Sequence, residues 1–259
     1  MNEVIVEKKG RTTVVTLNRP EARNALTRAV LSGITEAFTG AAEDRDVRAV
    51  VLTGSGGSFC AGADLRKTFS DDPDVMNHLG EYLDSFHAVI RAIVRCPKPT
   101  IASVDGPAVG FGADLAFACD LRVASTRAYL QEKFVNIGLM PDGGGTFWLP
   151  RLLGTARALK AIFLADELAA KELDALGLVV SVVPPEELGA ATMALAQRLE
   201  AGPPLAYQHA KQSVYAGLGD FEAALRRERE GQMVLLKSKD ALEGIMAWSE
   251  KRSPNFRGE

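Results

Sequence analysis

Hydrophobic and polar positions follow two different periods along the chain, and together they predict an α/β fold. Near the N-terminus, β-rich runs at 4–8 and 12–17 flank Gly10 and predict a hairpin. Two apolar runs that end at glycine, 48–54 and 100–106, predict buried strands. Helical periodicity predicts helices before each of these runs, at 24–42 and 79–95. Strands that alternate with helices predict a sheet covered by helices.

The second half of the chain changes from mixed to helical patterning. Strands are predicted at 120–125 and 177–183. Beyond them the pattern predicts helices, separated by Gly-Pro-Pro and Gly-Leu-Gly, at 186–200, 205–216, 221–237 and 240–251. We therefore expect a core of residues 1–200 that carries the site, and a helical region of residues 201–259. The acidic run 70–74 is expected to form a loop.

Length, charge and cysteine content exclude several classes of protein. The chain has 259 residues and a mass of 27.7 kDa, which is enough to bury a core without disulfides. A formal net charge of -3 and a pI near 5.8 give no basic stripe, so nucleic acid is not an expected partner. Three cysteines without a CxxC pair favour a reducing compartment, the cytoplasm, and no zinc site. Without a signal peptide or an apolar run of ~20 residues, we expect a soluble protein that does not bind membranes.

The glycine-containing turns do not match nucleotide-binding motifs. In LTGSGGSFCAGADL (52–65) and GFGADL (110–115), Phe59 and Leu115 stand where a dinucleotide fingerprint needs its third glycine. The chain also has no P-loop, no GxSxG and no HExxH. The histidines fall in helical patterns and are expected on helix faces or at the surface: His78, His87 and His209. We therefore expect neither a cofactor nor a metal ion.

Each of these two turns connects a predicted strand to the first turn of a predicted helix. A helix N-terminus presents unpaired N–H groups and the positive end of the helix dipole, so it stabilises negative charge. If the turns meet, the N–H groups of Ala63 and Phe111 would form an oxyanion hole, and small neighbours would allow close approach. The alternative is that the glycines only shape strand-to-helix turns.

A single carboxylate, Asp142, stands in the otherwise apolar run LMPDGGGTFW (139–148). Pro141 and Asp142 can begin a helix, so one interpretation is a cap that accepts hydrogen bonds from N–H groups of the glycine-rich turn. The other interpretation is an acid/base group whose pKa is raised by apolar neighbours such as Met140 and Trp148. The two roles are compatible.

Five ordered blocks resemble the enoyl-CoA hydratase/isomerase, or crotonase, superfamily. They span nearly the whole chain: NRPEARNAL (18–26), VRAVVLTGSGGSFCAGADL (47–65), KPTIASVDGPAVGFGADLAFACDLRVAS (98–125), GLMPDGGGTFWLPRLLG (138–154) and KRSPNF (251–256). The resemblance implies an α/β spiral of ββα units with a C-terminal helical trimerisation region, assembled as a homotrimer or as a hexamer of two trimers. It also implies an acyl-CoA thioester as substrate, with coenzyme A as part of that substrate and no separate cofactor.

The same resemblance assigns residues to an acyl-CoA site. It puts the oxyanion hole at the N–H groups of Ala63 and Phe111. Coenzyme A is expected along two turns and one helix, at Ala22, Arg23, Ala25, Ala61, Asp64, Leu65, Trp248 and Lys251. The last two are expected to reach the adenine end from a neighbouring subunit. The alternatives are a solvated surface charge for Arg23 and helix packing for Trp248.

The expected reaction depends on where this sequence departs from the hydratases that it resembles. Those enzymes activate water with two glutamates, whose positions here hold Asp114 and Phe134, and phenylalanine cannot move a proton. Asp142 matches the position where several non-hydratase members place a working carboxylate. The block around Asp142 most resembles the ring-1,2-epoxyphenylacetyl-CoA isomerase branch, whose members also shift double bonds of enoyl-CoA chains. A dehalogenase, which pairs its acid with a histidine and a tryptophan, is not expected.

The sequence therefore predicts an isomerase that shifts a C=C bond, or isomerises a ring epoxide, of an acyl-CoA with Asp142 as acid/base. One alternative is an enoyl-CoA hydratase that adds water to a 2-enoyl-CoA with Asp114 and Asp142, although Asp114 can equally be a buried helix acid. Another is a non-catalytic acyl-CoA binding subunit, in which the glycine turns hold the thioester and no acid moves a proton.

Overall fold

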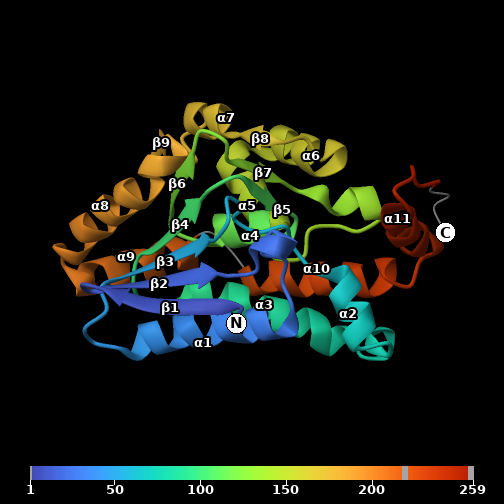
Figure 1. Cartoon of the computed structure of the whole chain (residues 1–259), viewed down its shortest axis with the longest axis horizontal. Coiled ribbons are helices and arrows are strands. Elements are labelled where there is room, and N and C mark those ends of the chain that lie inside the picture. Colours follow the sequence, from blue (N-terminus) through green and yellow to red (C-terminus); the bar gives the residue numbers. More distant parts are fainter. Residues whose placement is uncertain (1, 218–220, 256–259) are drawn as a thin grey trace.

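The computed structural model describes residues 2–217 and 221–255, and its largest element is a six-stranded sheet (Figure 1). The strands are β1 (Val4–Lys9), β2 (Thr12–Leu17), β3 (Ala49–Gly54), β4 (Thr100–Val104), β6 (Leu121–Ser125) and β9 (Ser181–Val183), in that order across the sheet. Only the β1–β2 pair is antiparallel. Because β3 and β4 are parallel neighbours, the segments that follow them leave from the same side of the sheet. Phe256 of the last sequence block lies outside the described residues.

Helices cover both faces of this sheet (Figure 1). α1 (Arg28–Glu43) and α3 (Leu79–Arg95) pack side by side on one face, and α8 (Leu188–Glu200) packs on the other. Consecutive residues of a strand point to opposite faces, so Val15 lies in the larger core with α1 and α3, and Val14 in the smaller core with α8. Both faces of the central strands β2, β3 and β4 are therefore buried, while the edge strand β1 is largely exposed.

A second, three-stranded sheet consists of β5 (Pro107–Val109), β7 (Tyr129–Gln131) and β8 (Leu168–Ala169). β4 continues into β5 and then into α4 (Phe111–Ala118), which is buried along its whole length. β6 continues in the same way into β7, so strand pairs recur ahead of helices. This confirms the expected ββα architecture, although the second sheet itself was not predicted, because strands of two or three residues show no period.

The C-terminal helices lie close to their predicted bounds: α9 (Pro204–Gly217), α10 (Phe221–Leu235) and α11 (Lys239–Glu250). α10 packs against α3 and α5 (Gly145–Leu153), and α11 packs against the 3-10 helix η3 (Lys133–Ile137). The C-terminal region therefore contacts the core directly. The division at residue 200 stays a prediction.

The first helix begins at Arg28, four residues later than predicted. Arg23 and Asn24 adopt positive φ angles that no helix contains, and the Thr27 hydroxyl caps α1 by accepting from the Val30 N–H. The residues between the hairpin and α1 therefore form a turn instead of a helical first turn.

Two other predictions are wrong in part. The strand expected at 177–183 is confined to β9, because Gly177 adopts a positive φ of 67° in the turn that follows α7 (Ala170–Ala175). The loop expected at 70–74 overlaps the end of α2 (Leu65–Asp71).

One further helix, α6 (Thr155–Leu164), follows α5 directly in the chain. Within the described ranges, no helix is long and apolar enough to cross a membrane.

Candidate active site

The two glycine turns identified in the sequence lie against each other. Cys60, in the turn after β3, forms an isolated parallel bridge with Ala108 of β5, and the Val109 N–H donates to the Cys60 carbonyl at 2.9 Å. These contacts bring the segment that leads to Ala63 beside the segment that leads to Phe111, the first residue of α4. The sequence left two interpretations of these glycines open: an oxyanion hole, or turns that only connect a strand to a helix. An oxyanion hole requires the two turns to meet, and they do meet.

Glycine is needed where the turns touch. Gly62 has a φ of +85°, and a Cβ there would lie 2.8 Å from a carbonyl oxygen of β5 and 3.5 Å from the Phe111 nitrogen. A Cβ on Gly112 would overlap the Cys60 carbonyl. In the part of the chain that the structure describes, neither the Ala63 nor the Phe111 N–H donates a hydrogen bond. Two adjacent backbone donors are thus available to a ligand.

The turn after β2 supports the first of these segments. Arg23 and Asn24 have φ angles of 50° and 57°, which are strained for residues other than glycine. The Asn24 side chain stabilises the turn, because it accepts from the Arg19 N–H and donates to two carbonyls of the turn after β3. The Arg23 carbonyl accepts from the Ala61 N–H at 3.0 Å. Four expected coenzyme A contacts therefore share one corner of the molecule: Ala22, Arg23, Ala25 and Ala61.

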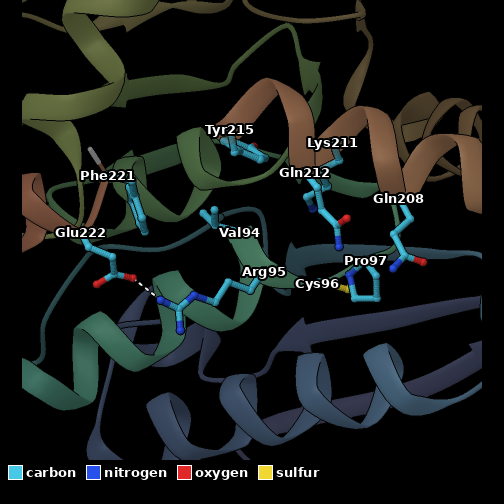
Figure 2. Close-up of a pocket in the computed structure, with 10 residues that line it drawn as sticks. All are labelled: Val94, Arg95, Cys96, Pro97, Gln208, Lys211, Gln212, Tyr215, Phe221 and Glu222. Atoms are coloured by element: carbon cyan, nitrogen blue, oxygen red, sulfur yellow. Dashed lines mark hydrogen bonds and ion pairs between the residues drawn. The ribbon is translucent and has the colours of Figure 1, made fainter. Parts of the chain in front are cut away.

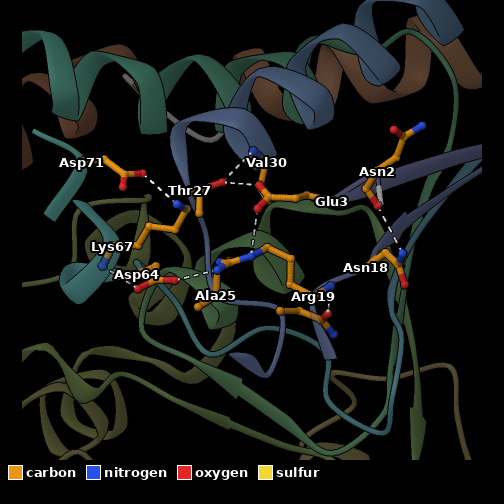
Figure 3. A network of polar contacts seen from close by, with 11 residues as sticks. Asn2, Glu3, Asn18, Arg19, Ala25, Thr27, Val30, Asp64, Lys67 and Asp71 are labelled. Carbon is orange, nitrogen blue, oxygen red and sulfur yellow. Dashed lines mark hydrogen bonds and ion pairs between the residues drawn. The ribbon is translucent and has the colours of Figure 1, made fainter. Parts of the chain in front are cut away.

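Asp64 has a structural role that the sequence did not indicate (Figure 3). Its Oδ1 accepts from the Lys67 N–H at 3.0 Å and caps α2, while its Oδ2 lies 2.9 Å from the Arg19 guanidinium. Arg19 is buried and also contacts Glu3 and the carbonyl of Ala25. The Asp64 carboxylate therefore stabilises the turn that carries the Ala63 N–H, and contact of Asp64 with coenzyme A stays a prediction.

The residues expected at the adenine end lie on α11. Leu65 begins α2, and the guanidinium of the next residue, Arg66, lies 5.2 Å from the centroid of the Trp248 ring. Trp248 is 47% exposed, and Lys251 follows α11 at the surface. Trp248 thus lies beside the start of α2 in its own chain, and the contact of Trp248 and Lys251 with the adenine end from a neighbouring subunit stays a prediction.

Asp142 lies between η3 and α5 and contacts two helices that are distant in sequence. Its Oδ2 accepts from the Gln232 amide of α10 at 2.9 Å, and its main-chain oxygen lies 2.9 Å from Nε2 of His87 on α3. The residue is half-buried, and its Oδ1 is shielded from solvent with no hydrogen-bond partner among residues 2–217 and 221–255. Burial raises the pKa of Asp142 to about 6, and the hydrogen bond from Gln232 opposes this rise. Such a carboxyl group can accept and return a proton near neutral pH.

The interpretation of Asp142 as a cap for the glycine turn is wrong. α5 begins at Gly145, and its N-cap residue is Gly144. The Gly143 N–H donates instead to Oδ2 of Asp114, at 3.0 Å. α4 packs against α5, so the buried Asp114 carboxylate of α4 contacts the glycine turn ahead of α5. The Asp142 carboxylate therefore does not bind this turn.

A second buried acid, Glu132, lies near Asp114 and was not singled out in the sequence. A Cβ on Gly145 would lie 2.9 Å from Oδ1 of Asp114 and 3.1 Å from Oε1 of Glu132, so two carboxyl groups flank this glycine. Asp114 is therefore part of a buried polar group next to the glycine turn, as expected for a buried helix acid.

Aromatic side chains pack around Phe111, the first residue of α4. Phe134 is 9% exposed, and a Cβ on Gly110 would lie 3.7 Å from its Cζ, so the ring packs beside the residue that precedes Phe111. Phe111 packs edge-to-face on Phe86 at a centroid distance of 4.7 Å, and Phe86 packs likewise on Tyr82 at 5.0 Å. Burial raises the pKa of Tyr82 to about 12, so its hydroxyl stays protonated. The surroundings are apolar, which strengthens electrostatic contacts inside the site.

Sequence reasoning missed His87 and Gln232. His87 was expected on a helix face or at the surface, but it is 1% exposed, and burial lowers its pKa, so the neutral ring donates from Nε2 to the Asp142 carbonyl. His87 does lie on a helix face, which is one of the two expected placements, but that face is buried. One signal was present, since His87 falls on the apolar stripe of α3 between Leu83 and Ile90. No comparable signal marks Gln232, which lies 90 residues from its partner.

A separate pocket lies between the end of α3 and α9 (Figure 2). Its lining includes Arg95, Cys96, Lys211 and Tyr215, and none of the predicted site residues. Nζ of Lys211 lies 2.8 Å from the Asp120 carboxylate, and the Tyr215 hydroxyl donates to the same group at 2.9 Å. These polar groups stabilise the fold. In the described part of the chain, no three or more His, Cys, Asp or Glu side chains form a cluster that could hold a metal ion.

The fold and the paired turns define the class of protein: the chain belongs to the enoyl-CoA hydratase/isomerase family, whose model matches residues 7–259. The 1,2-epoxyphenylacetyl-CoA isomerase of Escherichia coli (strain K12) is 35% identical over 247 residues, which cover 95% of this chain and 94% of the relative. The 2,3-dehydroadipyl-CoA hydratase of the same organism is 35% identical over 259 residues, with 100% of both chains covered.

A solved structure agrees with this assignment. An enoyl-CoA hydratase from Mycobacterium avium subsp. paratuberculosis K-10 superposes with a TM-score of 0.89 at 37% sequence identity, covering 98% of each chain. Further relatives with hydratase names include the crotonyl-CoA hydratase of Syntrophomonas wolfei, which is 36% identical over 255 residues, covering 98% of this chain and 97% of the relative. These names do not support the preference for an isomerase, and the reaction depends on the residues of this chain.

Proposed function

We propose that this enzyme is an acyl-CoA isomerase that shifts a C=C bond, or isomerises a ring epoxide, through a thioester enolate. For the double-bond shift, a C–H bond α to the thioester breaks, an O–H bond forms on Asp142, and the electron pair moves to the thioester oxygen. In the return step that O–H bond breaks and a C–H bond forms at the far end of the allylic system. Asp142 thus regains its starting state, and no water is taken up.

The observation that best supports this proposal is the state of Asp142. Its pKa of about 6 suits a group that must accept and return a proton, and its Oδ1 has no hydrogen bond in the described residues that would compete for that proton. Phe134 supports it further, because an apolar ring packs where a hydratase of this family would carry its second glutamate. Nε2 of His87 donates to the main-chain oxygen of Asp142, so the proposal gives His87 a structural role and Asp142 the proton transfer.

The negative charge of the enolate needs stabilisation, which the proposal assigns to the N–H groups of Ala63 and Phe111. Removal of one oxyanion-hole donor raises the barrier by ~3 kcal/mol in other enzymes in which this was measured. The N-terminus of α4 adds the positive end of a helix dipole at the Phe111 donor. The thioester oxygen would lie between the two glycine turns, with coenzyme A along the corner formed by Arg23 and Ala61.

An enoyl-CoA hydratase is the second candidate, and the names of most relatives favour it. It would need Asp114 and Asp142 to hold one water molecule, and both acids lie beside Gly143. Against it, Oδ2 of Asp114 already accepts from the Gly143 N–H, and Asp114 is buried beside Glu132. This arrangement gives Asp114 a structural role and leaves one acid for chemistry.

Paired variants separate the candidates. The isomerase account predicts that Asp142→Asn lowers kcat on a 3-enoyl-CoA about 10²–10⁴-fold, the contribution of a general base, with coenzyme A affinity kept. It also predicts loss of solvent deuterium exchange at the α carbon, whereas Asp114→Asn should mainly lower thermal stability. Full turnover of Asp142→Asn would contradict the isomerase account. Equal loss of crotonyl-CoA hydration in both variants would support the hydratase, and tight binding without turnover or exchange in the unmodified protein would support a binding subunit.

We infer further that the chain assembles as a homotrimer, or as a hexamer of two trimers, through residues 201–259. Large apolar side chains are exposed on each of the C-terminal helices, among them Leu205, Val234 and Leu242. Light scattering should give three or six times the mass of one chain. Cytoplasmic location is part of the same proposal, since all three cysteines are free and buried.

A further inference from the structure

Ion pairs fix the position of α10 on α3. Arg91 of α3 lies 3.2 Å from the Glu222 carboxylate of α10, and Arg229 of α10 lies 3.2 Å from the Asp84 carboxylate of α3. In one pair the cation is on α3, and in the other it is on α10. A shift of one helix along the other would break both pairs. The seam between α3 and α10 is therefore defined in register.

Both groups that hold Asp142 come from this seam. His87 lies on α3 between the two ion pairs, and Gln232 lies on α10 one turn beyond Arg229. His87 contacts the main-chain oxygen of Asp142, while Gln232 contacts the carboxylate itself. The backbone and the side chain of one residue are thus fixed separately.

Gln232 is not explained by packing. It is 0% exposed, and its Oε1 is buried without a hydrogen-bond partner within residues 2–217 and 221–255. A buried amide oxygen without a partner destabilises a fold, so an apolar side chain of the same size would pack better. Its amide nitrogen, however, donates to Oδ2 of Asp142 at 2.9 Å. The contact with the carboxylate is therefore the feature that a glutamine provides here.

We propose that Gln232 is a positioning residue for proton transfer, because it occupies Oδ2 of Asp142 and leaves Oδ1 to exchange the proton with the substrate. This inference rests on the proposed function and assigns the reacting atom. A proton on Oδ2 would face the amide hydrogen of Gln232, so the proton resides on Oδ1. When the substrate C–H bond breaks, the O–H bond forms at Oδ1, and the same bond breaks when the proton returns to the distal carbon.

Other charges near the site do not replace this contact. The titratable and charged groups on the elements packed around Asp142 include Tyr82, Asp84, His87 and Arg91 of α3, Asp114 of α4, Glu132 ahead of η3, Arg151 of α5, and Glu222 and Arg229 of α10. After burial, the hydrogen bond from Gln232 has the largest influence on the pKa of Asp142. A donor to the charged form stabilises that form, so its removal must raise the pKa.

The test compares Gln232→Met, which removes the donor at similar size, with Gln212→Met, a control on the exposed side of α9. We expect the pKa of Asp142, read from the acidic limb of the kcat profile, to rise by about 1 in Gln232→Met. At pH 6 this lowers kcat about fivefold, with KM nearly unchanged, because the ionised fraction of Asp142 falls by that factor. Gln212→Met should keep the profile of the unmodified enzyme, and an unchanged profile in Gln232→Met would overturn the proposal.

A second readout does not depend on turnover. Infrared difference titration of the free enzyme follows the protonated carboxyl band that Asp142→Asn removes, and gives the pKa directly. The pKa of Asp142 should rise in Gln232→Met. It should rise further in Gln232→Glu, because two neighbouring carboxyl groups do not both ionise easily. Gln232→Glu also serves if Gln232→Met does not fold, and a pKa that stays constant or falls overturns the inference. Full turnover of Asp142→Asn would refute the proposed function, while the titration would still decide whether Gln232 holds the carboxylate.

Discussion

The oxyanion side and the acid side of this site are constructed from different parts of the chain. On the proposed oxyanion side the candidate groups are backbone N–H donors, and their positions follow from glycines in two turns that touch directly. On the acid side the functional group is one side chain, and its surroundings come from His87 and Gln232, which lie 55 and 90 residues away. The first side therefore depends on backbone contact, and the second depends on individual side chains.

The largest effect is expected from a change that separates the turns. In Gly112→Ala the added methyl would overlap the Cys60 carbonyl, so the donor at Phe111 should move. We expect kcat to fall about 10²–10³-fold, as when one oxyanion donor is lost. Gly40→Ala is the control, because a Cβ there meets nothing within 4 Å. Normal kcat in Gly112→Ala, measured by steady-state kinetics, would show that catalysis does not need this close contact.

The next effect concerns the acid side and its response to pH. The pKa of Asp142 rises from 3.8 to about 6 on folding, so its contribution to stability is complete below pH 3.8 and is lost as the pH rises through 6. Asp142→Asn lacks this titration. Its free energy of unfolding, relative to the unmodified protein, should therefore increase by about 2 kcal/mol between pH 4 and pH 8. Urea denaturation at both pH values measures this change, and a constant difference would contradict a raised pKa.

A smaller effect is expected from the ion pairs under the oxyanion turn. Arg19→Met leaves Glu3 and Asp64 without their shared cation in a largely buried position. The free energy of unfolding should fall by about 2–3 kcal/mol, with kcat reduced less than tenfold, because Asp64 still caps α2. Lys8→Met, which breaks an exposed pair with Asp44, is the control and should cost less than about 1 kcal/mol. Equal losses in the two variants would show that the buried network adds nothing.

The smallest effect is expected at Trp248, beyond both sides of the site. If its ring contacts adenine, Trp248→Ala should raise KM for an acyl-CoA about three- to tenfold at constant kcat, because the contact is equal in the ground state and the transition state. The matching pantetheine thioester, which lacks adenine, should show no change in KM. A rise in KM with both substrates would instead indicate a packing role for this residue.

The same contrast explains what the sequence could predict. Glycine spacing after two strands identified Ala63 and Phe111, and the structure brings these turns together because β3 and β4 are parallel neighbours. Long segments with clear periods, such as α3 and α8, were predicted within two residues. The very short strands β5, β7 and β8 were not, since they contain too few residues to show a period.

The environment of Asp142 could be predicted only in part. Apolar neighbours in its own segment correctly indicated a raised pKa. Its hydrogen-bond partners depend on how α3 and α10 pack, which no local pattern reports. Asp114, and not Asp142, binds the glycine turn. The sequence could not show this either, because the contact depends on how α4 packs against α5. A buried histidine on an apolar stripe is the signal that could have been used.

The central claim is that Asp142 moves a proton without adding water. The most direct test is to incubate the purified protein in oxygen-18-labelled water with a 3-enoyl-CoA and, separately, with crotonyl-CoA. The masses of the products are then measured by mass spectrometry. The account predicts conversion of the 3-enoyl to the 2-enoyl thioester and no labelled oxygen in the crotonyl sample. Rapid labelling of crotonyl-CoA would contradict it and would show that Asp114 and Asp142 together activate water.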